Sequence, residues 1–121
     1  CIPIFAIGCE TDHIAAWKDS YRGIQLMGSK EKKFILAESG HIAGIINPPD
    51  KNKYGYYLNQ DLTLNSESWR EKASYLSGSW WPEWEKWVKF YSGSQVEARK
   101  EGSKSYPPLS DAPGSYVLKK S

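Results

Sequence analysis

Asp12 and His41 are the two residues whose types and placement are best suited to acid–base chemistry. Each lies in a loop after a short apolar run: IPIFAIG precedes Asp12, and KFILA precedes His41. A carboxylate that accepts a hydrogen bond from an imidazole can fix the tautomer of that histidine, and the histidine can then transfer a proton. This chemistry requires that the surrounding elements bring the two side chains together.

The segments around Asp12 and His41 predict a strand, helix, strand unit. Residues 2–7 form a continuous apolar run, which is typical of a strand covered on both faces. Apolar side chains in residues 14–26 recur mostly at three- and four-residue steps and predict a helix, and residues 34–37 predict the second strand. Two strands joined in this way lie parallel, and their loops emerge at the edge where open α/β sheets bind ligands. We therefore expect the acid and the imidazole to lie side by side.

The rest of the chain is expected to pack around this unit. The stretch NPPDKNKYGYY contains prolines and polar residues and predicts a long ordered loop that could form one wall of a site. Residues 66–75 predict a short helix with Ser66 as its cap and Trp69 on its inner side. A clearer helix is predicted in WWPEWEKWVKFYSG, where Pro82 suits the first turn. The final segment, YPPLSDAPGSYV, is expected to lie extended across the body.

Four aromatic residues of the WWPEWEKWVKFYSG helix fall on one stripe: Trp80, Trp84, Trp87 and Tyr91. We expect this stripe to pack against the sheet or a neighbouring element. The alternative is an apolar interface or the wall of a ligand site.

Length and charge limit the classes of function. The chain has 121 residues, enough for one ordinary domain, and it begins with Cys1 and a strand-like run, so we interpret it as a fragment. Sixteen basic and fourteen acidic residues give a net charge of +2, which does not favour a nucleic-acid binder. No apolar stretch is long enough to predict a transmembrane helix.

The two cysteines, Cys1 and Cys9, have neither C-x-x-C nor metal-ligand spacing, so no metal site is expected. If the run between them is extended, their Cα atoms lie too far apart for a disulfide. Reduced thiols and a cytoplasmic location are the favoured interpretation.

The order of Asp12 and His41 along the chain matches the last two members of an α/β-hydrolase site, in which nucleophile, acid and histidine follow in that order. No G-x-S-x-G or G-x-C-x-G occurs in the chain, and Cys9 is a poor substitute because it lies on the acid-bearing loop. The predicted fold class is therefore α/β, as the C-terminal portion of an α/β-hydrolase fold. It would contain the last parallel strands and flanking helices, and the nucleophile-bearing part would be absent.

Four blocks of sequence resemble the C-terminal part of polyhydroxyalkanoate synthases, most closely the short-chain, single-subunit kind. These blocks occur in the family's order and span nearly the whole chain: TDHIAAWKDSYRG, ESGHIAGIINPPDKNK, GSWWPEWEKW and YPPLSDAPGSYV. The resemblance implies that residues 1–121 are a C-terminal fragment of one synthase catalytic domain. It also implies polymerisation of (R)-3-hydroxyacyl-CoA, in particular 3-hydroxybutyryl-CoA, with release of CoA.

The resemblance implies a covalent mechanism with cysteine, histidine and aspartate, in which this chain supplies Asp12 and His41 as catalytic residues. The cysteine has no counterpart, so the fragment alone is expected to be inactive. Asp12 could orient His41 or could help to deprotonate the 3-hydroxyl group that extends the chain. No cofactor is expected, because CoA is a leaving group.

Four further residues are weaker candidates. His13 is expected to stabilise the loop or to contact the catalytic pair, without taking part in the reaction itself. Lys51, Asn52 and Lys53 follow the loop that carries His41 and could bind the phosphates of CoA, but simple exposed charge is the favoured interpretation.

The expected partners are hydroxyacyl-CoA and the growing polyester. Candidate protein partners are the rest of a synthase, a second copy in a homodimer, or polymer-granule proteins, so the granule surface is a candidate location. One alternative is an esterase or depolymerase of the same fold. The other is a non-catalytic module that binds granules or a synthase through its tryptophans. We also expect the first strand to expose an apolar sheet edge that promotes association.

Overall fold

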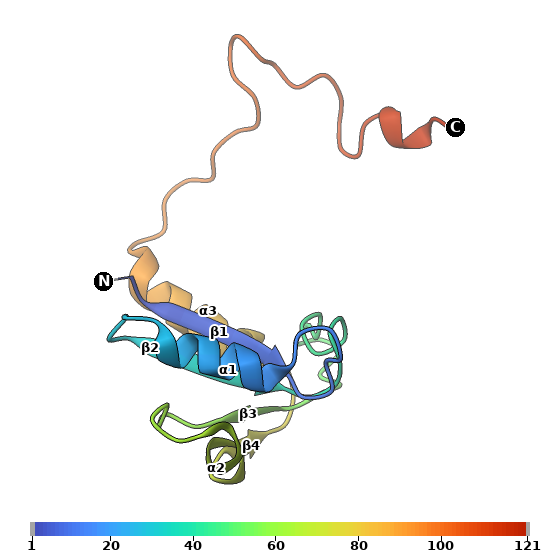
Figure 1. The fold of residues 1–121 in the computed structure, drawn as a ribbon. Helices are drawn as coiled ribbons and strands as arrows, with labels where there is room; N and C mark the ends of the chain where they lie inside the picture. The colour runs from blue at the N-terminus through green and yellow to red at the C-terminus, as the bar shows by residue number, and fades with distance from the viewer. Residues whose placement is uncertain (1, 121) are drawn as a thin grey trace.

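The computed structural model describes residues 2–120 (Figure 1). Its elements follow in the order β1 (Ile4–Cys9), α1 (Trp17–Leu26), β2 (Lys32–Ala37), β3 (Tyr56–Leu58), α2 (Ser66–Glu71), β4 (Ser74–Leu76) and α3 (Trp81–Ser92). A 3-10 turn, η1 (Tyr116–Leu118), lies near the C-terminus. Predictions that concern Cys1 lie outside the described residues.

The predicted strand, helix, strand unit is confirmed. β1 and β2 pair in parallel, from Ile4 opposite Lys32 to Cys9 opposite Ala37, and α1 connects them. Both strands differ slightly from the predicted ranges: β1 begins and ends two residues later, and β2 begins two residues earlier. The parallel register places the C-terminal ends of the two strands next to each other, and their loops therefore leave the sheet at one edge.

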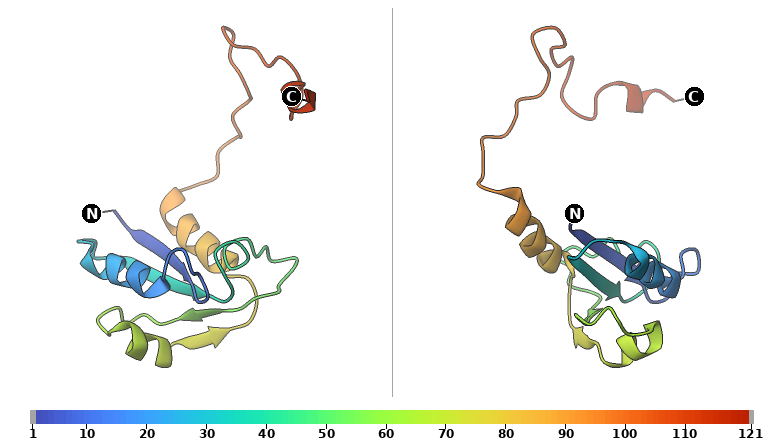
Figure 2. Two further views of the ribbon diagram at one scale, coloured as in Figure 1. Left: turned by 45° about the vertical axis from the view of Figure 1, so that its right-hand side comes forward. Right: turned by 60° about the vertical axis from the view of Figure 1, so that its left-hand side comes forward.

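The sheet within residues 2–120 has four strands in the order β1-β2-β3-β4. β3 pairs antiparallel with β2, and β4 pairs antiparallel with β3. Helices cover both faces, with α1 and α2 on one face and α3 on the other (Figure 2). The observed fold is thus mixed α/β and layered.

One face of the sheet packs against α1 and α2. Phe34 and Leu36 of β2 contact a cluster that includes Tyr21, Ile24 and Trp69, and each of these side chains is at most 1% exposed. The rings of Phe34 and Trp69 meet edge to face, with centroids 5.3 Å apart. Burial of a large apolar side chain contributes about 1.5–3 kcal/mol, so this cluster fixes α1 and α2 on the sheet.

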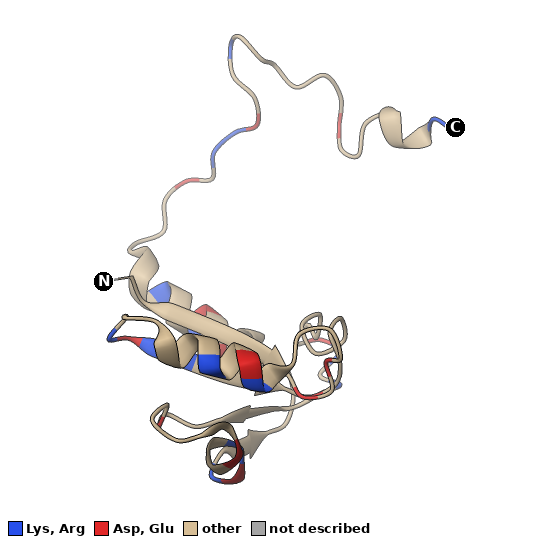
Figure 3. Ribbon diagram, viewed as in Figure 1, with Lys and Arg blue, Asp and Glu red and all other residues tan. Residues whose placement is uncertain are grey.

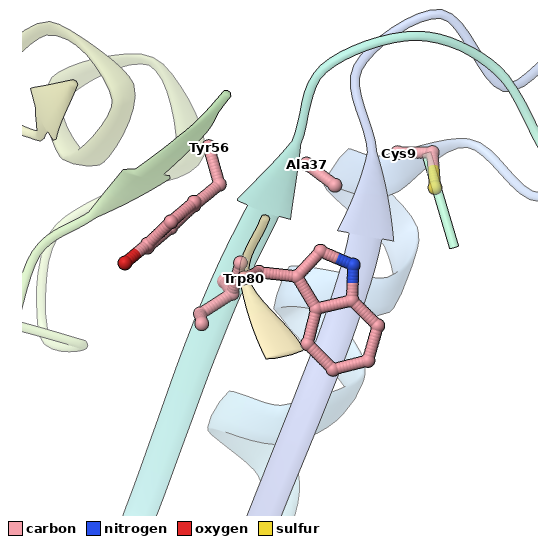
Figure 4. Packing of buried hydrophobic residues seen from close by; sticks show 5 residues of the cluster. Cys9, Ala37, Tyr56 and Trp80 are labelled. Atoms are coloured by element: carbon pink, nitrogen blue, oxygen red, sulfur yellow. The ribbon is translucent and has the colours of Figure 1, made fainter. Parts of the chain in front are cut away.

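The other face carries the alternate residues of the same strands. Cys9, Ala37, Tyr56 and Trp80 form a buried cluster there, as Figure 4 shows from close by. Two buried faces explain why β1 and β2 are apolar throughout rather than alternating.

Two predictions between residues 47 and 76 were wrong in part. Tyr56 and Tyr57 belong to β3 rather than to a loop, and the helix predicted over 66–75 ends at Glu71 so that Ser74 begins β4. These two short strands form because each finds a partner, and the rings of Tyr57 and Tyr75 pack across them with centroids 5.1 Å apart.

The cap of α2 also differs from the prediction. Asn65, not Ser66, is the N-cap, and its side chain accepts a hydrogen bond from the N–H of Ser68 at 2.9 Å. Trp69 lies on the inner side as predicted.

The predicted helix over the WWPEWEKWVKFYSG segment is confirmed as α3, with Pro82 in its first turn. Its aromatic stripe packs only in part. Trp80 is 7% exposed, and the ring of Trp87 lies 5.4 Å from that of Phe5, whereas Trp84 and Tyr91 are 46% and 42% exposed. Trp84 instead lines an open surface hollow with Ile45 and Ile46, and the hydroxyl of Tyr91 donates a hydrogen bond to Glu31.

The C-terminal segment does not lie across the body, contrary to the prediction. Residues 94–113 and 115–120 are exposed, and Figure 1 shows the segment leading away from the sheet. Its backbone hydrogen bonds are local, such as those between Ser103 and Tyr106. Figure 3 shows acidic and basic residues interspersed along it, and such residues are stable in water without a partner surface.

Among residues 2–120, no helix is long and apolar enough to cross a membrane. The same residues hold no group of three or more His, Cys, Asp or Glu placed to bind a metal ion.

Candidate functional site

The loops after β1 and β2 are joined by backbone hydrogen bonds that extend the parallel ladder. The N–H of Glu10 donates to the carbonyl of Ala37 at 2.9 Å, and the N–H of Thr11 donates to the carbonyl of Ser39 at 3.1 Å. The two chains therefore stay paired for two residues beyond the strands. Asp12 and His41 follow directly from this paired segment.

Asp12 and His41 contact each other. The Nδ1 atom of His41 lies 2.8 Å from Oδ2 of Asp12. The Asp12 side chain is 6% exposed, whereas the His41 side chain is 51% exposed. The structure thus brings together the two residues that the sequence singled out, with the acid on the inside and the imidazole open on its outer side.

The Asp12 carboxylate is held by backbone donors as well as by the imidazole. Its Oδ1 atom accepts hydrogen bonds from the N–H groups of Ile14 at 2.8 Å and Ala15 at 3.0 Å. The Ala15 N–H contributes most, followed by the His41 hydrogen bond, and together they lower the pKa of Asp12 to about 2. Asp12 is therefore an anion across the neutral range.

The geometry determines which nitrogen of His41 carries a proton when the ring is neutral. A carboxylate is only an acceptor, so Nδ1 must donate to Asp12. Nε2 is then unprotonated and can accept a proton from another group. This is the arrangement of a general base whose tautomer is set by an acid.

Two glutamates that begin the site loops anchor them to other elements. Glu10 follows β1, and its Oε1 accepts hydrogen bonds from Nε and Nη2 of Arg70 at 3.0 and 2.8 Å. Glu38 follows β2, and its Oε2 accepts from the N–H of Gly55 at 2.6 Å and from the hydroxyl of Tyr75 at 3.0 Å. Sequence reasoning missed these anchors. Their only signal is an acid directly after each strand.

The histidine loop contains one strained residue and one crowded glycine. Ser39 has a φ of 73°, a left-handed conformation that a residue with a Cβ atom rarely adopts. At Gly44 a Cβ atom would lie 2.7 Å from Sγ of Cys9 and 2.7 Å from the carbonyl oxygen of Glu38. The loop therefore packs so closely on the end of β1 that no side chain fits at Gly44.

Cys9 lies beneath this loop and is 2% exposed. Burial, and then the charge of Asp12, raise the pKa of its thiol. A raised pKa reduces the thiolate fraction and with it the nucleophilicity. Contrary to the prediction that Cys9 lies on the acid-bearing loop, it is the last residue of β1. Its burial is a different reason to expect a poor nucleophile.

The weaker candidates lie apart from this pair or on the surface. His13 is exposed and has no side-chain hydrogen bond among the described residues. Lys51, Asn52 and Lys53 are exposed on the loop after His41. Asn52 also has a structural contact, because its Oδ1 accepts a hydrogen bond from the N–H of Ser79 at 3.2 Å. The functional roles suggested for these four residues stay predictions.

The fold and the site together define a class: a mixed α/β segment with an acid–imidazole pair where two parallel strands end. Comparison with known proteins finds polymerases that are similar to the chain. The chain is 41% identical over 119 residues to the poly(3-hydroxyalkanoate) polymerase subunit PhaC of Rhizobium etli, and 43% identical over 115 residues to poly(3-hydroxyalkanoate) polymerase 2 of Ectopseudomonas oleovorans. The PhaC subunit of Cupriavidus necator is 38% identical over 120 residues.

Over nearly its whole length the chain is similar to the C-terminal part of poly(3-hydroxyalkanoate) polymerases. These matches cover 98%, 94% and 98% of the chain but only 19% to 20% of the relatives, so the chain spans about a fifth of their length. No family model matches the chain.

Proposed function

We propose that this chain is the acid- and base-bearing portion of a polyester polymerase catalytic domain with an α/β-hydrolase fold. Residues 1–121 form the C-terminal part of that domain, and a cysteine nucleophile is carried elsewhere in the polymerase. The observation that supports this most directly is the 2.8 Å contact between His41 and Asp12 at the ends of parallel strands. The similarity to named poly(3-hydroxyalkanoate) polymerases supports polyester synthesis as the reaction.

The proposed reaction is acyl transfer from (R)-3-hydroxyacyl-CoA, in particular 3-hydroxybutyryl-CoA. Nε2 of His41 takes the proton of the cysteine thiol, and the thiolate attacks the thioester carbonyl. The C–S bond to CoA breaks, and the CoA thiolate leaves with the proton that His41 held. The hydroxyl group of a second hydroxyacyl unit then attacks the acyl-enzyme carbonyl while His41 accepts the hydroxyl proton. The ester C–O bond forms, the C–S bond to the cysteine breaks, and His41 returns the proton to the cysteine thiolate.

Asp12 has the role of orienting His41 in this proposal. Its two carboxylate oxygens are both engaged: Oδ1 by two backbone N–H groups and Oδ2 by the imidazole. Direct deprotonation of the substrate hydroxyl by Asp12 would require one of these contacts to break. Its pKa of about 2 also makes it a weak base compared with an imidazole.

The free edge of β1 supports the α/β-hydrolase assignment. Within the described residues β1 pairs only with β2, although helices cover both of its faces. In the proposal, further parallel strands of the polymerase pair with β1 and carry the nucleophile on a neighbouring loop. That loop would emerge at the same edge as Asp12 and His41.

The remaining assignments follow from the polymerase reaction. CoA is a leaving group, and no cofactor takes part. Lys51 and Lys53 are exposed on the loop after His41 and could meet the CoA phosphates. The growing polyester is the acceptor, and we place the enzyme at the polymer granule in the cytoplasm.

The test compares the activities of variants at His41, Asp12 and His13 in a complete poly(3-hydroxyalkanoate) polymerase that contains this segment. We expect His41→Ala to abolish polymer formation and release of CoA from 3-hydroxybutyryl-CoA, because the base is lost. Asp12→Asn is expected to reduce the rate by about 10²- to 10⁴-fold. His13→Ala is the matched control beside Asp12 and is expected to retain most of the activity.

Equal loss in His41→Ala and His13→Ala would contradict these roles. The 121-residue chain alone is expected to release no CoA, and measurable turnover by it would overturn the assignment of the nucleophile to other sequence. The product separates the polymerase from a same-fold hydrolase: polyester supports the proposal, whereas free 3-hydroxy acid as the main product does not. Granule binding without turnover in the complete protein would favour the non-catalytic alternative.

A further inference from the structure

The turn that carries His41 receives two hydrogen bonds from tryptophan side chains. Nε1 of Trp80 donates to the carbonyl of Gly44 at 2.9 Å, and Nε1 of Trp81 donates to the carbonyl of Ile45 at 2.9 Å. The donors are consecutive residues at the start of α3, and the acceptors are consecutive residues just after His41. We call residues 41–46 the histidine turn.

The indole N–H groups donate to two carbonyl groups of the turn that accept no backbone hydrogen bond among the described residues. The N–H of Gly44 donates to the carbonyl of Gly40, just before the histidine turn, at 2.9 Å, and the N–H of Ile46 donates to the carbonyl of Ile42 within the turn at 2.8 Å. The carbonyls of Gly44 and Ile45 lie further along the turn, and each accepts a hydrogen bond from one indole N–H. A buried carbonyl without a donor is unfavourable, so the two indole hydrogen bonds stabilise the packing of the turn against α3.

The tryptophans are themselves fixed in place. Trp80 is 7% exposed and belongs to the buried cluster with Cys9, and Figure 4 shows its indole lying across the sheet near the ends of β1 and β2. The rings of Trp80 and Trp81 lie 6.3 Å apart, and Phe5 packs 6.4 Å from Trp80. The hydrogen-bond donors therefore belong to side chains that pack against other aromatic rings.

We propose that Trp80 and Trp81 are positioning residues that hold the histidine turn against α3 and so keep Nδ1 of His41 on Oδ2 of Asp12. Neither tryptophan touches the reacting atoms in this inference; both act through His41. The inference deepens the proposed function, on which it rests for its catalytic meaning. The effect on the acid–imidazole contact is independent of any reaction.

Trp81→Phe in the 121-residue chain is the sharpest test. Phenylalanine keeps an aromatic ring but lacks the indole N–H, and Trp81 is only half-buried, so the fold should tolerate it. Trp84→Phe is the matched control: it lies three residues further along α3, is exposed, and has no hydrogen bond to the histidine turn within the described residues.

The measurement is the pKa of the Asp12 carboxyl group, followed by ¹³C NMR during an acid titration. His41 is one of the groups that hold this pKa at about 2, below its ordinary value of 3.8. A loosened histidine turn weakens that contact, so we expect Trp81→Phe to raise the pKa of Asp12 toward 3.8. Trp84→Phe is expected to leave it unchanged. A change in stability alone would not move this pKa, because the Ile14 and Ala15 donors lie on the aspartate loop.

Trp80→Phe supplies a second variant, with near-ultraviolet circular dichroism to check that its core stays folded. In the complete polymerase, both variants are expected to lower kcat by up to about 10²-fold, with KM little changed, because His41 is misplaced rather than removed. An unchanged Asp12 pKa in folded Trp81→Phe and Trp80→Phe would overturn the inference. If that pKa rises but kcat does not fall, the positioning is real and the proposed catalytic role of the pair is wrong.

Discussion

Three loop groups donate hydrogen bonds to the Asp12 carboxylate: two backbone N–H groups and one imidazole. The buried thiol of Cys9, at the end of β1, is close enough for the Asp12 charge to affect its pKa. The three donors stabilise the charged form, and the thiol has its own pKa raised partly by that charge. One ionised residue thus organises its own loop, orients the histidine and disfavours ionisation of the nearest cysteine.

The lowered pKa of Asp12 predicts acid sensitivity. Because its pKa is about 2 in the folded chain and 3.8 ordinarily, its stabilising contribution is complete above about pH 4 and is lost as the pH falls toward 2. We expect urea unfolding between pH 4 and pH 2 to show a smaller loss of stability in Asp12→Asn than in the unmodified chain.

His41→Ala is the control for that acid-sensitivity measurement. It removes only one of the groups that lower the Asp12 pKa and leaves the Ala15 and Ile14 donors in place. The stability that this variant loses between pH 4 and pH 2 should therefore lie between the losses of the unmodified chain and of Asp12→Asn. If all three proteins lose the same stability between pH 4 and pH 2, Asp12 titrates with its ordinary pKa.

At the scale of elements, the site depends on two parallel strands and on the segments that brace their loops. β1 and β2 bring the two loops together, and the pairing continues beyond the strands through Glu10 and Thr11. α2 and the β3–β4 pair hold the loop starts through Glu10 and Glu38. The end of the histidine loop is held by α3.

Gly44 tests this close packing directly. In Gly44→Ala the new methyl group would meet the Cys9 sulfur and the Glu38 carbonyl at 2.7 Å, so the loop must move. We expect a loss of about 1–3 kcal/mol in the free energy of unfolding and a shifted His41 ring signal in NMR spectra. Gly23→Ala in α1 is the control, since no atom lies within 4 Å of its added Cβ, and it should gain about 0.5–1 kcal/mol. Equal stability in the two variants would contradict the described contact.

The whole molecule is a layered α/β body with an exposed C-terminal segment, and within residues 2–120 its sheet ends in two unpaired edges, at β1 and at β4. Ile4 and Glu10 direct their N–H groups toward the β2 side, to the carbonyls of Glu31 and Ala37. Successive N–H groups in a strand point to opposite sides, so those of Phe5 and Ile7 point to the free edge. Such an edge is a site for strand pairing with another chain.

Hydrogen exchange should detect this edge. In dilute solution we expect the amides of Phe5 and Ile7 to exchange faster than those of Ala6 and Gly8, which face β2. As the protein concentration rises, association through the edge should slow exchange at Phe5 and Ile7, and sedimentation should show larger species. A species that stays monomeric at all concentrations, with all four amides equally protected, would contradict an open edge.

The sequence by itself determined the strand, helix, strand unit and the meeting of Asp12 with His41. Both follow from local patterns: apolar runs, helical spacing, and the rule that a helical crossover joins parallel strands. It also determined α3, whose start is marked by Pro82. Only the tertiary structure decided that residues 56–58 and 74–76 are strands, that the C-terminal segment leaves the body, and that glutamate and indole contacts hold the loops. Each of these depends on whether a partner surface is available, and the hydrogen bonds of Glu38, Trp80 and Glu10 reach across 17, 36 and 60 residues of sequence. No pattern confined to one segment reveals such a contact.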